Sequence, residues 1–311
     1  MTSLLCRPLS SHIQAIFIQA ILGKGDGRRV KDTTTLLPQH MGFVFSFALQ
    51  KGGAGKTTTV LSLASILVRM GKKVLCVDID PQFNLTQGLA VDLNQVEYSV
   101  YEVLLNPEQG TSFATIPTRV GVDLIPATLD LSGAEMELAG QVGRELLLRD
   151  ALYTESTPGA QDAAINRYDY ILIDPPPSLG VFTYNALVAS TTVIVPLEMG
   201  VYAWNAMPQL EVAIHKCRRL NPSLHLGGII CTRYNRSKNL SKAIEQQVRQ
   251  KYGPLVFNQV IPENVKVSES PAAGQPIDLY APHSPGSLAY SAVAKALIER
   301  YDVSSHVGGK A

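Results

Sequence analysis

The sequence lacks three features that would place it in other classes of protein. Its four cysteines form no C-x-x-C pair, and their spacing matches neither a zinc site nor a disulfide framework, which is typical of a reduced, cytoplasmic compartment. The net charge is only +1, so any nucleic-acid role must come from a local patch. The apolar run near the N-terminus, residues 13–22, is too short to span a bilayer, and only Arg7 precedes it as a basic lead-in to a secretory signal.

What remains is a chain of 311 residues with 46% hydrophobic residues, which can bury one large core. Residues 23–40 are rich in glycine and charge, show no period and indicate a linker. Met41 stands directly before the first strand-like run and offers an alternative start. We therefore expect residues 1–40 to be a dispensable extension or a start-site artefact, residues 41–303 to form one domain, and residues 304–311 to form a flexible tail.

Short apolar runs alternate with segments of helical period from Met41 onward. Continuous apolar runs indicate strands that are covered on both faces, and such strands occur in mostly parallel sheets. The fold class is therefore α/β, a doubly wound and mostly parallel sheet flanked by helices. We expect strands over residues 43–49, 74–79, 122–127, 170–174, 192–197, 227–231 and 256–261, and helices over residues 57–70, 179–190, 203–220, 240–252 and 287–301.

The first predicted strand runs into the glycine-rich segment KGGAGKTTT (51–59) and then into a helix, which is the context of a phosphate-binding loop. Its glycines allow backbone N–H groups to turn toward phosphate oxygens, and the helix N-terminus adds partial positive charge. Lys56 can reach the β- and γ-phosphates, and the Thr57 hydroxyl can ligate Mg²⁺. We expect the nucleotide to contact Lys51, Gly52, Gly53, Ala54, Gly55, Lys56, Thr57 and Thr58.

Gln50 occupies the position where the usual phosphate loop has its first glycine, and Lys51 follows it. In this departure the chain resembles the deviant Walker A family of ParA and MinD, whose loop reads KGGxGKT with an additional signature lysine, matched by Lys51. The resemblance spans roughly residues 43–301. It implies an ATPase with ATP and Mg²⁺ as cofactors, in which two protomers sandwich two ATP molecules and Lys51 crosses to the phosphates of the other protomer. A second ammonium there neutralises charge that develops during hydrolysis, so cleavage depends on dimerisation.

Two acidic loops complete the site that the resemblance implies. The segment DIDPQFN (78–84) resembles switch I of the family, so that Asp80 would orient or activate the attacking water and Asp78 would support the Mg²⁺ shell. The segment YDYILIDPPPSLG (168–180) resembles Walker B and switch II, so that Asp174 would hold Mg²⁺ through water. With Lys51 and Lys56, Asp80 would form the catalytic set. At the adenine end the resemblance implies Thr232, Arg233, Pro262, Glu263 and Asn264.

A basic patch stands out in a chain that is otherwise nearly neutral. Between positions 216 and 251 there are nine lysines and arginines and one glutamate, which gives a local charge of +8. Such asymmetry is typical of a polyanion-binding face. ParA-type members bind DNA through this part of the chain without sequence preference, and the residues expected to do so are Lys216, Arg218, Arg219, Lys242 and Arg249.

The resemblance is nearest to partitioning ATPases of the ParA/Soj type. It implies an ATP-dependent homodimer on the nucleoid, bound to DNA without sequence preference and released when a ParB-like or other cargo-adaptor protein stimulates hydrolysis. The alternative is a MinD-like regulator of division-site placement. Its membrane-binding amphipathic helix has no counterpart in the final residues, YDVSSHVGGKA, so we expect no membrane association. Iron–sulfur relatives need bridging cysteines, and none are spaced for that role.

Overall fold

The computed structural model describes residues 41–53, 55–154 and 163–302, with only the backbone at residues 201–204. The predicted extension over residues 1–40 and the predicted tail over residues 304–311 lie outside the described residues, as does Ala54.

The described residues form one eight-stranded sheet with the order β3-β4-β2-β5-β1-β6-β7-β8. Every neighbouring pair is parallel except β3 and β4, which are antiparallel at one edge. The first strand in sequence therefore lies in the interior of the sheet, between β5 and β6. The strands are β1 (Phe43–Phe47), β2 (Val74–Asp78), β3 (Ile116–Pro117), β4 (Asp123–Ile125), β5 (Tyr170–Asp174), β6 (Thr192–Glu198), β7 (His225–Tyr234) and β8 (Val256–Pro262).

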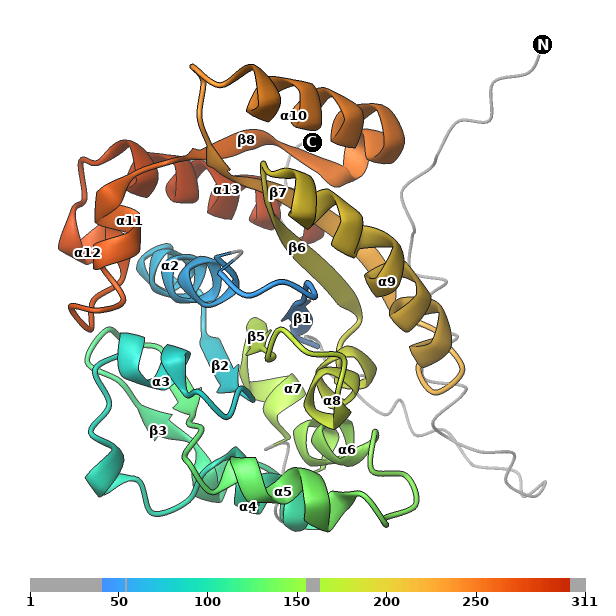
Figure 1. Cartoon of the computed structure of the whole chain (residues 1–311). Helices are drawn as coiled ribbons and strands as arrows, with labels where there is room; N and C mark the ends of the chain where they lie inside the picture. Colours follow the sequence, from blue (N-terminus) through green and yellow to red (C-terminus); the bar gives the residue numbers. More distant parts are fainter. Residues whose placement is uncertain (1–40, 54, 155–162, 303–311) are drawn as a thin grey trace, which may run out of the picture. The chain divides into compact units, whose positions relative to one another are not determined.

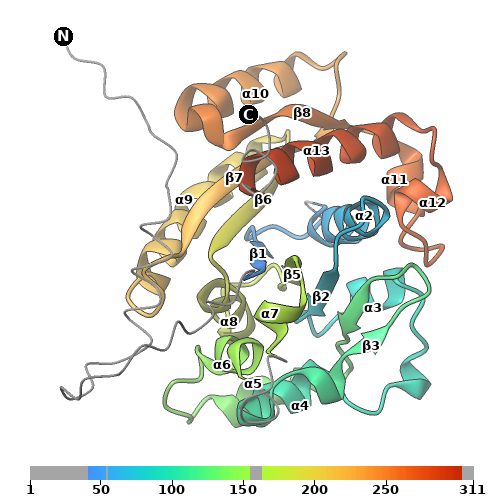
Figure 2. The ribbon, with the colours of Figure 1, turned by 180° about the vertical axis from the view of Figure 1, so that it is seen from behind.

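Helices cover both faces of this sheet, with α2 and α13 on one side and α8 and α9 on the other (Figures 1 and 2). The described helices are α2 (Lys56–Arg69), α3 (Asn84–Gly88), α4 (Val100–Leu105), α5 (Leu131–Leu138), α6 (Leu147–Tyr153), α7 (Ala164–Arg167), α8 (Val181–Ala189), α9 (Val201–Cys217), α10 (Asn239–Tyr252), α11 (Val265–Glu269), α12 (Ile277–Tyr280) and α13 (Pro285–Tyr301). Short 3-10 turns lie at Leu93–Gln95, Pro107–Gln109, Ser112–Ala114 and Gly253–Leu255.

Alternate residues of the central strands enter opposite layers of the core. In β1, Val44 packs into the layer that includes α4 to α8, whereas Phe45 packs into the layer formed by α2 and α13. In β6, Val193 packs against α9 and α10, whereas Ile194 faces α2 and α13. Because both faces of these central strands are buried, most of their residues are apolar, and this is the origin of the continuous runs in the sequence.

The sequence prediction of a doubly wound, mostly parallel α/β sheet is confirmed. All seven expected strands are present with ends shifted by up to three residues, and the five expected helices are α2, α8, α9, α10 and α13. The expectation did not include β3, or the short helices between residues 84 and 167. These elements are two to eight residues long, which is too short to show a period.

Candidate functional site

The phosphate-binding loop connects β1 to α2 at the carboxyl edge of the sheet. Gly53 and Gly55 adopt left-handed backbone conformations, with φ of 70° and 84°, which favour glycine. Apart from each glycine and its two neighbours in the chain, no described atom lies within 4 Å of the position that a Cβ would occupy at Gly52, Gly53 or Gly55. No side chain caps α2, so the N–H groups of its first turn remain available. The loop therefore presents open space and backbone donors, which fit a chain of phosphates.

Lys56, the first residue of α2, is buried beside this space. Its ammonium donates to the Lys51 carbonyl at 3.4 Å. Burial lowers the pKa of Lys56, and the nearby carboxylates of Asp174 and Asp80 oppose that decrease. The carboxylates favour the charged form of Lys56, and a buried ammonium next to the open loop can pair with the phosphate of a nucleotide.

Asp78 and Asp174 end the adjacent strands β2 and β5, and the sheet register pairs their Cα positions directly. Asp78 is fully buried and accepts hydrogen bonds from the Thr86 N–H and hydroxyl, both at 2.8 Å. Burial raises the pKa of Asp78 to about 7, although these hydrogen bonds oppose the increase. The site therefore contains one buried carboxylate whose acceptor atoms are already engaged.

Asp174 is buried as well, but its two carboxylate oxygens make no hydrogen bond of normal geometry with the described residues. Burial, followed by the neighbouring Asp78 carboxylate, raises the pKa of Asp174 to about 8. The Thr57 hydroxyl and the Lys56 ammonium are close enough to oppose this increase. A buried carboxylate pair of this kind is electrostatically unfavourable without a cation, and a Mg²⁺ ion beside Asp174 and Thr57 would relieve it.

Among the described residues, no three Asp, Glu, His or Cys side chains come together as a complete metal site. Mg²⁺ usually keeps several waters and binds through one or two protein groups plus substrate phosphates. The residues present fit that mode of binding. Thr57 and Asp174 would be close to the ion, and Asp78 would support it.

Asp80 follows the second strand in a tight turn. Its Oδ1 accepts the Gln82 N–H at 3.0 Å, and its carbonyl accepts the Phe83 N–H at 2.8 Å. Phe83 adopts a left-handed conformation with φ of 44°, which is uncommon for a residue other than glycine. Its side chain packs against the core layer on the α4 to α8 side. The turn therefore fixes the backbone that carries Asp80.

Lys51 points toward the end of β6, where its ammonium forms an ion pair with the Glu198 carboxylate. Both side chains are 24% exposed. The Arg233 guanidinium lies 3.8 Å from the other oxygen of Glu198. Sequence analysis did not single out Glu198 or Thr86, because nothing in their local sequence signals a contact with residues far away in the chain.

The residues predicted for the adenine end gather at the carboxyl ends of β7 and β8. The Tyr234 carbonyl accepts the Glu263 N–H at 3.0 Å, and the Asn235 amide donates to the Glu263 carboxylate at 2.7 Å. Asn264 caps α11 through the Lys266 N–H. Thr232, Arg233, Pro262, Glu263 and Asn264 thus belong to one pair of adjacent strand ends, and their role in adenine binding remains a prediction.

The predicted basic face lies on α9, the turn that follows it and α10, and the Lys251–Glu211 ion pair joins the two helices. Lys216, Arg218, Arg219 and Lys242 are exposed and make no ion pair within the described part of the chain. Arg249 differs. Its guanidinium donates to Glu245 at 2.9 Å and to the carbonyls of Phe257 and Asn258 at 3.1 and 3.3 Å. Much of its hydrogen-bonding capacity is therefore used inside the fold.

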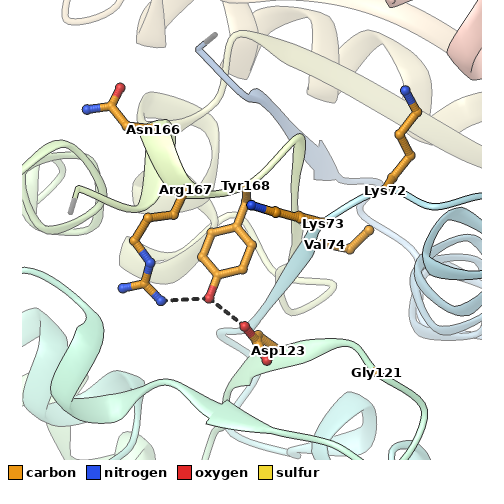
Figure 3. Close-up of a pocket in the computed structure, with 8 residues that line it drawn as sticks. All are labelled: Lys72, Lys73, Val74, Gly121, Asp123, Asn166, Arg167 and Tyr168. Atoms are coloured by element: carbon orange, nitrogen blue, oxygen red, sulfur yellow. Dashed lines mark hydrogen bonds between the residues drawn. The ribbon is translucent and has the colours of Figure 1, made fainter. Parts of the chain in front are cut away.

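A cavity of about 490 Å³ lies at the amino ends of β2 and β4, at the opposite edge from the phosphate loop (Figure 3). There the Tyr168 hydroxyl donates to Asp123 at 2.7 Å and accepts from Arg167 at 2.9 Å. None of the predicted site residues lines this cavity, so it is separate from the nucleotide site.

Comparison with known proteins identifies the family. A family model described as an AAA domain matches residues 42–226. The chain is 40% identical to the sporulation initiation inhibitor protein Soj of Bacillus subtilis over 256 residues, which are 82% of this chain and 98% of Soj. It is also 40% identical to the chromosome partitioning protein ParA of Caulobacter vibrioides over 258 residues, 83% of this chain and 94% of ParA. The chain belongs to the ParA/Soj/MinD family of P-loop ATPases.

Solved structures of relatives extend the comparison. A protein of Mycobacterium smegmatis named cobyrinic acid a,c-diamide synthase is 35% identical, with a TM-score of 0.71, over 85% of this chain and 97% of that chain. Its structures contain ADP with magnesium and an ATP analogue with magnesium. This ParA-family ATPase is thus a homologue of chromosome partitioning proteins. Across its described residues, no helix has the length and apolar character needed to cross a bilayer.

Proposed function

We propose that this ParA-family ATPase binds ATP and Mg²⁺ at residues 51–58, pairs with a second copy of itself in the ATP state, and then binds DNA without sequence preference. The observation that carries the proposal is the arrangement around Asp174, where an unpartnered buried carboxylate, a buried Lys56 and an open glycine-lined loop meet. Each of the three is electrostatically or sterically incomplete in the protein alone. Mg²⁺ and a nucleotide triphosphate would complete all of them.

When bound, Mg²⁺ would neutralise charge on the transferring phosphoryl group. The protein's own residues supply the remaining parts. Lys56 and the backbone donors of the loop hold the phosphates, and Asp80 orients the attacking water. Lys51 acts across the dimer, which requires its ammonium to leave Glu198. Hydrolysis then requires dimerisation. A ParB-like or other cargo-adaptor protein stimulates this hydrolysis.

Identity to Soj and ParA supports a role in partitioning DNA or positioning cargo, with the protein on the nucleoid in the cytoplasm. The exposed cations of α9, of the turn after it and of α10 support DNA binding, because none of Lys216, Arg218, Arg219 and Lys242 forms an ion pair with an acid among the described residues. Binding that depends on ATP would follow from pairing, which doubles the number of phosphate contacts.

A DNA co-sedimentation assay with ATP, with ADP and without nucleotide tests the proposal. We expect sedimentation of the full chain only with ATP and Mg²⁺. Asp80→Ala should bind ATP, fail to hydrolyse it and remain on DNA, whereas Lys51→Ala should neither self-associate nor sediment. Sedimentation that is the same in all nucleotide states would leave a P-loop ATPase without the proposed DNA switch.

A further inference from the structure

Thr86 is fully buried in the first turn of α3, after the loop that carries Asp80. Its N–H and its hydroxyl both donate to one carboxylate oxygen of Asp78, Oδ2, each at 2.8 Å. The N–H belongs to the first turn of a helix, where backbone donors have no partner within the helix. Two donors of a single residue therefore converge on the carboxylate that ends β2.

The other oxygen of Asp78 contacts the start of the same loop. It accepts the Asp80 N–H at 3.2 Å. The Asp80 carbonyl in turn accepts the Phe83 N–H at 2.8 Å, which closes the turn that leads to α3. The Asp78 carboxylate thus joins both ends of the segment from Asp80 to Thr86. Thr86 supplies two of the three hydrogen bonds that this carboxylate accepts from described residues, so the position of the Asp80 backbone depends on Thr86.

The Thr86 hydroxyl is held from its other side as well. It accepts the Ala127 N–H at 3.1 Å, in the loop after β4, which is the strand next to β2. Ala127 is also fully buried. A hydroxyl can donate one hydrogen bond and accept another, whereas valine has the same shape and can do neither. Because the hydroxyl accepts from Ala127, its own proton is directed toward Asp78.

We infer that Thr86 is a positioning residue for ATP hydrolysis, which orients the Asp78 carboxylate and thereby holds the backbone of Asp80. The inference deepens the proposed function and rests on it, because Asp80 there orients the attacking water. Among the described residues, the Thr86 hydroxyl bonds to Asp78 and Ala127 and to none of the phosphate loop. Its loss should therefore slow hydrolysis more than it weakens ATP binding by residues 51–58.

The test compares the single-turnover rate of ATP hydrolysis with the Kd for a non-hydrolysable ATP analogue and Mg²⁺, both measured on the full chain. Thr86→Val removes the hydroxyl and keeps the branched shape, whereas Thr86→Ser keeps the hydroxyl and loses a methyl group. The matched control is Ser65→Ala on α2. Ser65 is also buried, and its hydroxyl donates to another buried carboxylate, that of Asp278 on α12, at 3.0 Å.

We expect Thr86→Val to lower the single-turnover rate about tenfold and to change the Kd less than about twofold, because the groups that bind the phosphates stay in place. Thr86→Ser should restore the rate to nearly that of the unaltered chain. Ser65→Ala should lower the melting temperature and leave the rate unchanged. Should Thr86→Val fail to fold, Thr86→Ala removes the same hydroxyl without placing a second methyl group against Asp78.

Hydrogen exchange reports on the loop directly. The Asp80 N–H is protected by its hydrogen bond to Asp78, so Thr86→Val should speed the exchange of this amide about tenfold. Ser65→Ala should leave that exchange unchanged. The measurement is made with ADP and Mg²⁺, so that the nucleotide site is occupied in every sample.

Three results would overturn the inference. They are a Thr86→Val variant that hydrolyses ATP at the unaltered rate, a Thr86→Ser variant that is as slow as Thr86→Val, and exchange of the Asp80 amide that does not respond to Thr86→Val. Failure of the proposed function is distinguishable from these results. In that case Asp80→Ala itself hydrolyses ATP at the unaltered rate, whereas failure of the inference alone leaves Asp80→Ala inactive.

Discussion

The Lys51 ammonium is held by the Glu198 carboxylate of its own chain, so that the loop after β1 is joined to the end of β6. The proposed dimer needs that ammonium at the phosphates of a second copy, so the ion pair competes with pairing of the copies. A partly exposed pair of this kind contributes about 1 kcal/mol.

Glu198→Gln should therefore strengthen ATP-dependent self-association by about 30-fold, because each dimer that forms breaks two such ion pairs. Sedimentation equilibrium with ATP and Mg²⁺ measures the effect. Lys72→Gln is a matched control, since Lys72 is equally exposed and forms an ion pair with Asp302 elsewhere in the fold. Unchanged self-association in Glu198→Gln would show that the ion pair does not restrain Lys51.

The raised pKa values of Asp78 and Asp174 predict an unusual pH dependence for the protein without ligands. Burial moves the pKa of these carboxyl groups from 3.8 to about 7 and about 8, so the folded protein holds protons that the unfolded chain releases. The free energy of unfolding should then decrease as the pH rises from about 4 to about 8. Thermal denaturation in a chelator between pH 5.5 and 8.5 measures this.

Asp174→Asn should flatten that dependence, and Mg²⁺ with an ATP analogue should remove most of it, because the bound cation favours the ionised carboxylates. A melting temperature of the ligand-free protein that rises over the same interval would contradict the assignment of these carboxylates.

Arg249 and Lys242 should respond differently to truncation, although both lie on α10. Arg249→Ala removes hydrogen bonds to the Phe257 and Asn258 carbonyls, so it should lower the free energy of unfolding by about 1 to 2 kcal/mol. Lys242→Ala should leave the stability unchanged and weaken DNA binding. Chemical denaturation and DNA titration separate the two effects.

The salt dependence provides a second measurement on the same face. If about two phosphates are neutralised per protomer, the log affinity of the dimer for DNA should fall with log salt with a slope of roughly −3 to −4. Lys242→Ala should make this slope shallower. Affinity that does not change with salt would exclude phosphate contacts by the basic face.

Phe83 anchors the turn that carries Asp80, and its removal should affect hydrolysis more than nucleotide binding. Phe83→Gly keeps the left-handed conformation accessible but loses the packing against the core, so Asp80 becomes less well positioned and turnover falls about tenfold. Ala90→Gly is the control, because Ala90 is also left-handed, with φ of 56°. It should raise stability by about 1 kcal/mol without changing turnover.

Much of this architecture was predictable because the interior strands are buried on both faces. Residues 170–174 were assigned without error, and the phosphate loop followed from its place between a strand and a helix. Asp78 and Asp174 were expected at one edge because parallel strands end on the same side. Apart from β4, the region from 84 to 153 was not predictable, since its helices are short and its edge strand β3 has two residues.

The long-range contacts that position the residues of the site could not be predicted from the sequence either. Lys51 and Glu198 are 147 positions apart, and Ala127 reaches Thr86 across 41 positions. Such contacts depend on how loops from different strands pack together, and neither residue type nor spacing encodes that packing locally. Arg249 was assigned to DNA from the local charge and the family resemblance, but its hydrogen bonds to the Phe257 and Asn258 carbonyls of β8 became visible only once α10 was placed.

The register of the parallel pairing between β2 and β5 places Asp78 directly beside Asp174. A shift of one residue in either strand would turn one carboxylate to the far side of the sheet while leaving most of the pairing intact. Insertions beyond Gln82 or Pro176 would lengthen loops without moving either carboxylate. The two loops can therefore change in length without displacing Asp78 or Asp174, provided that the two strands keep their lengths.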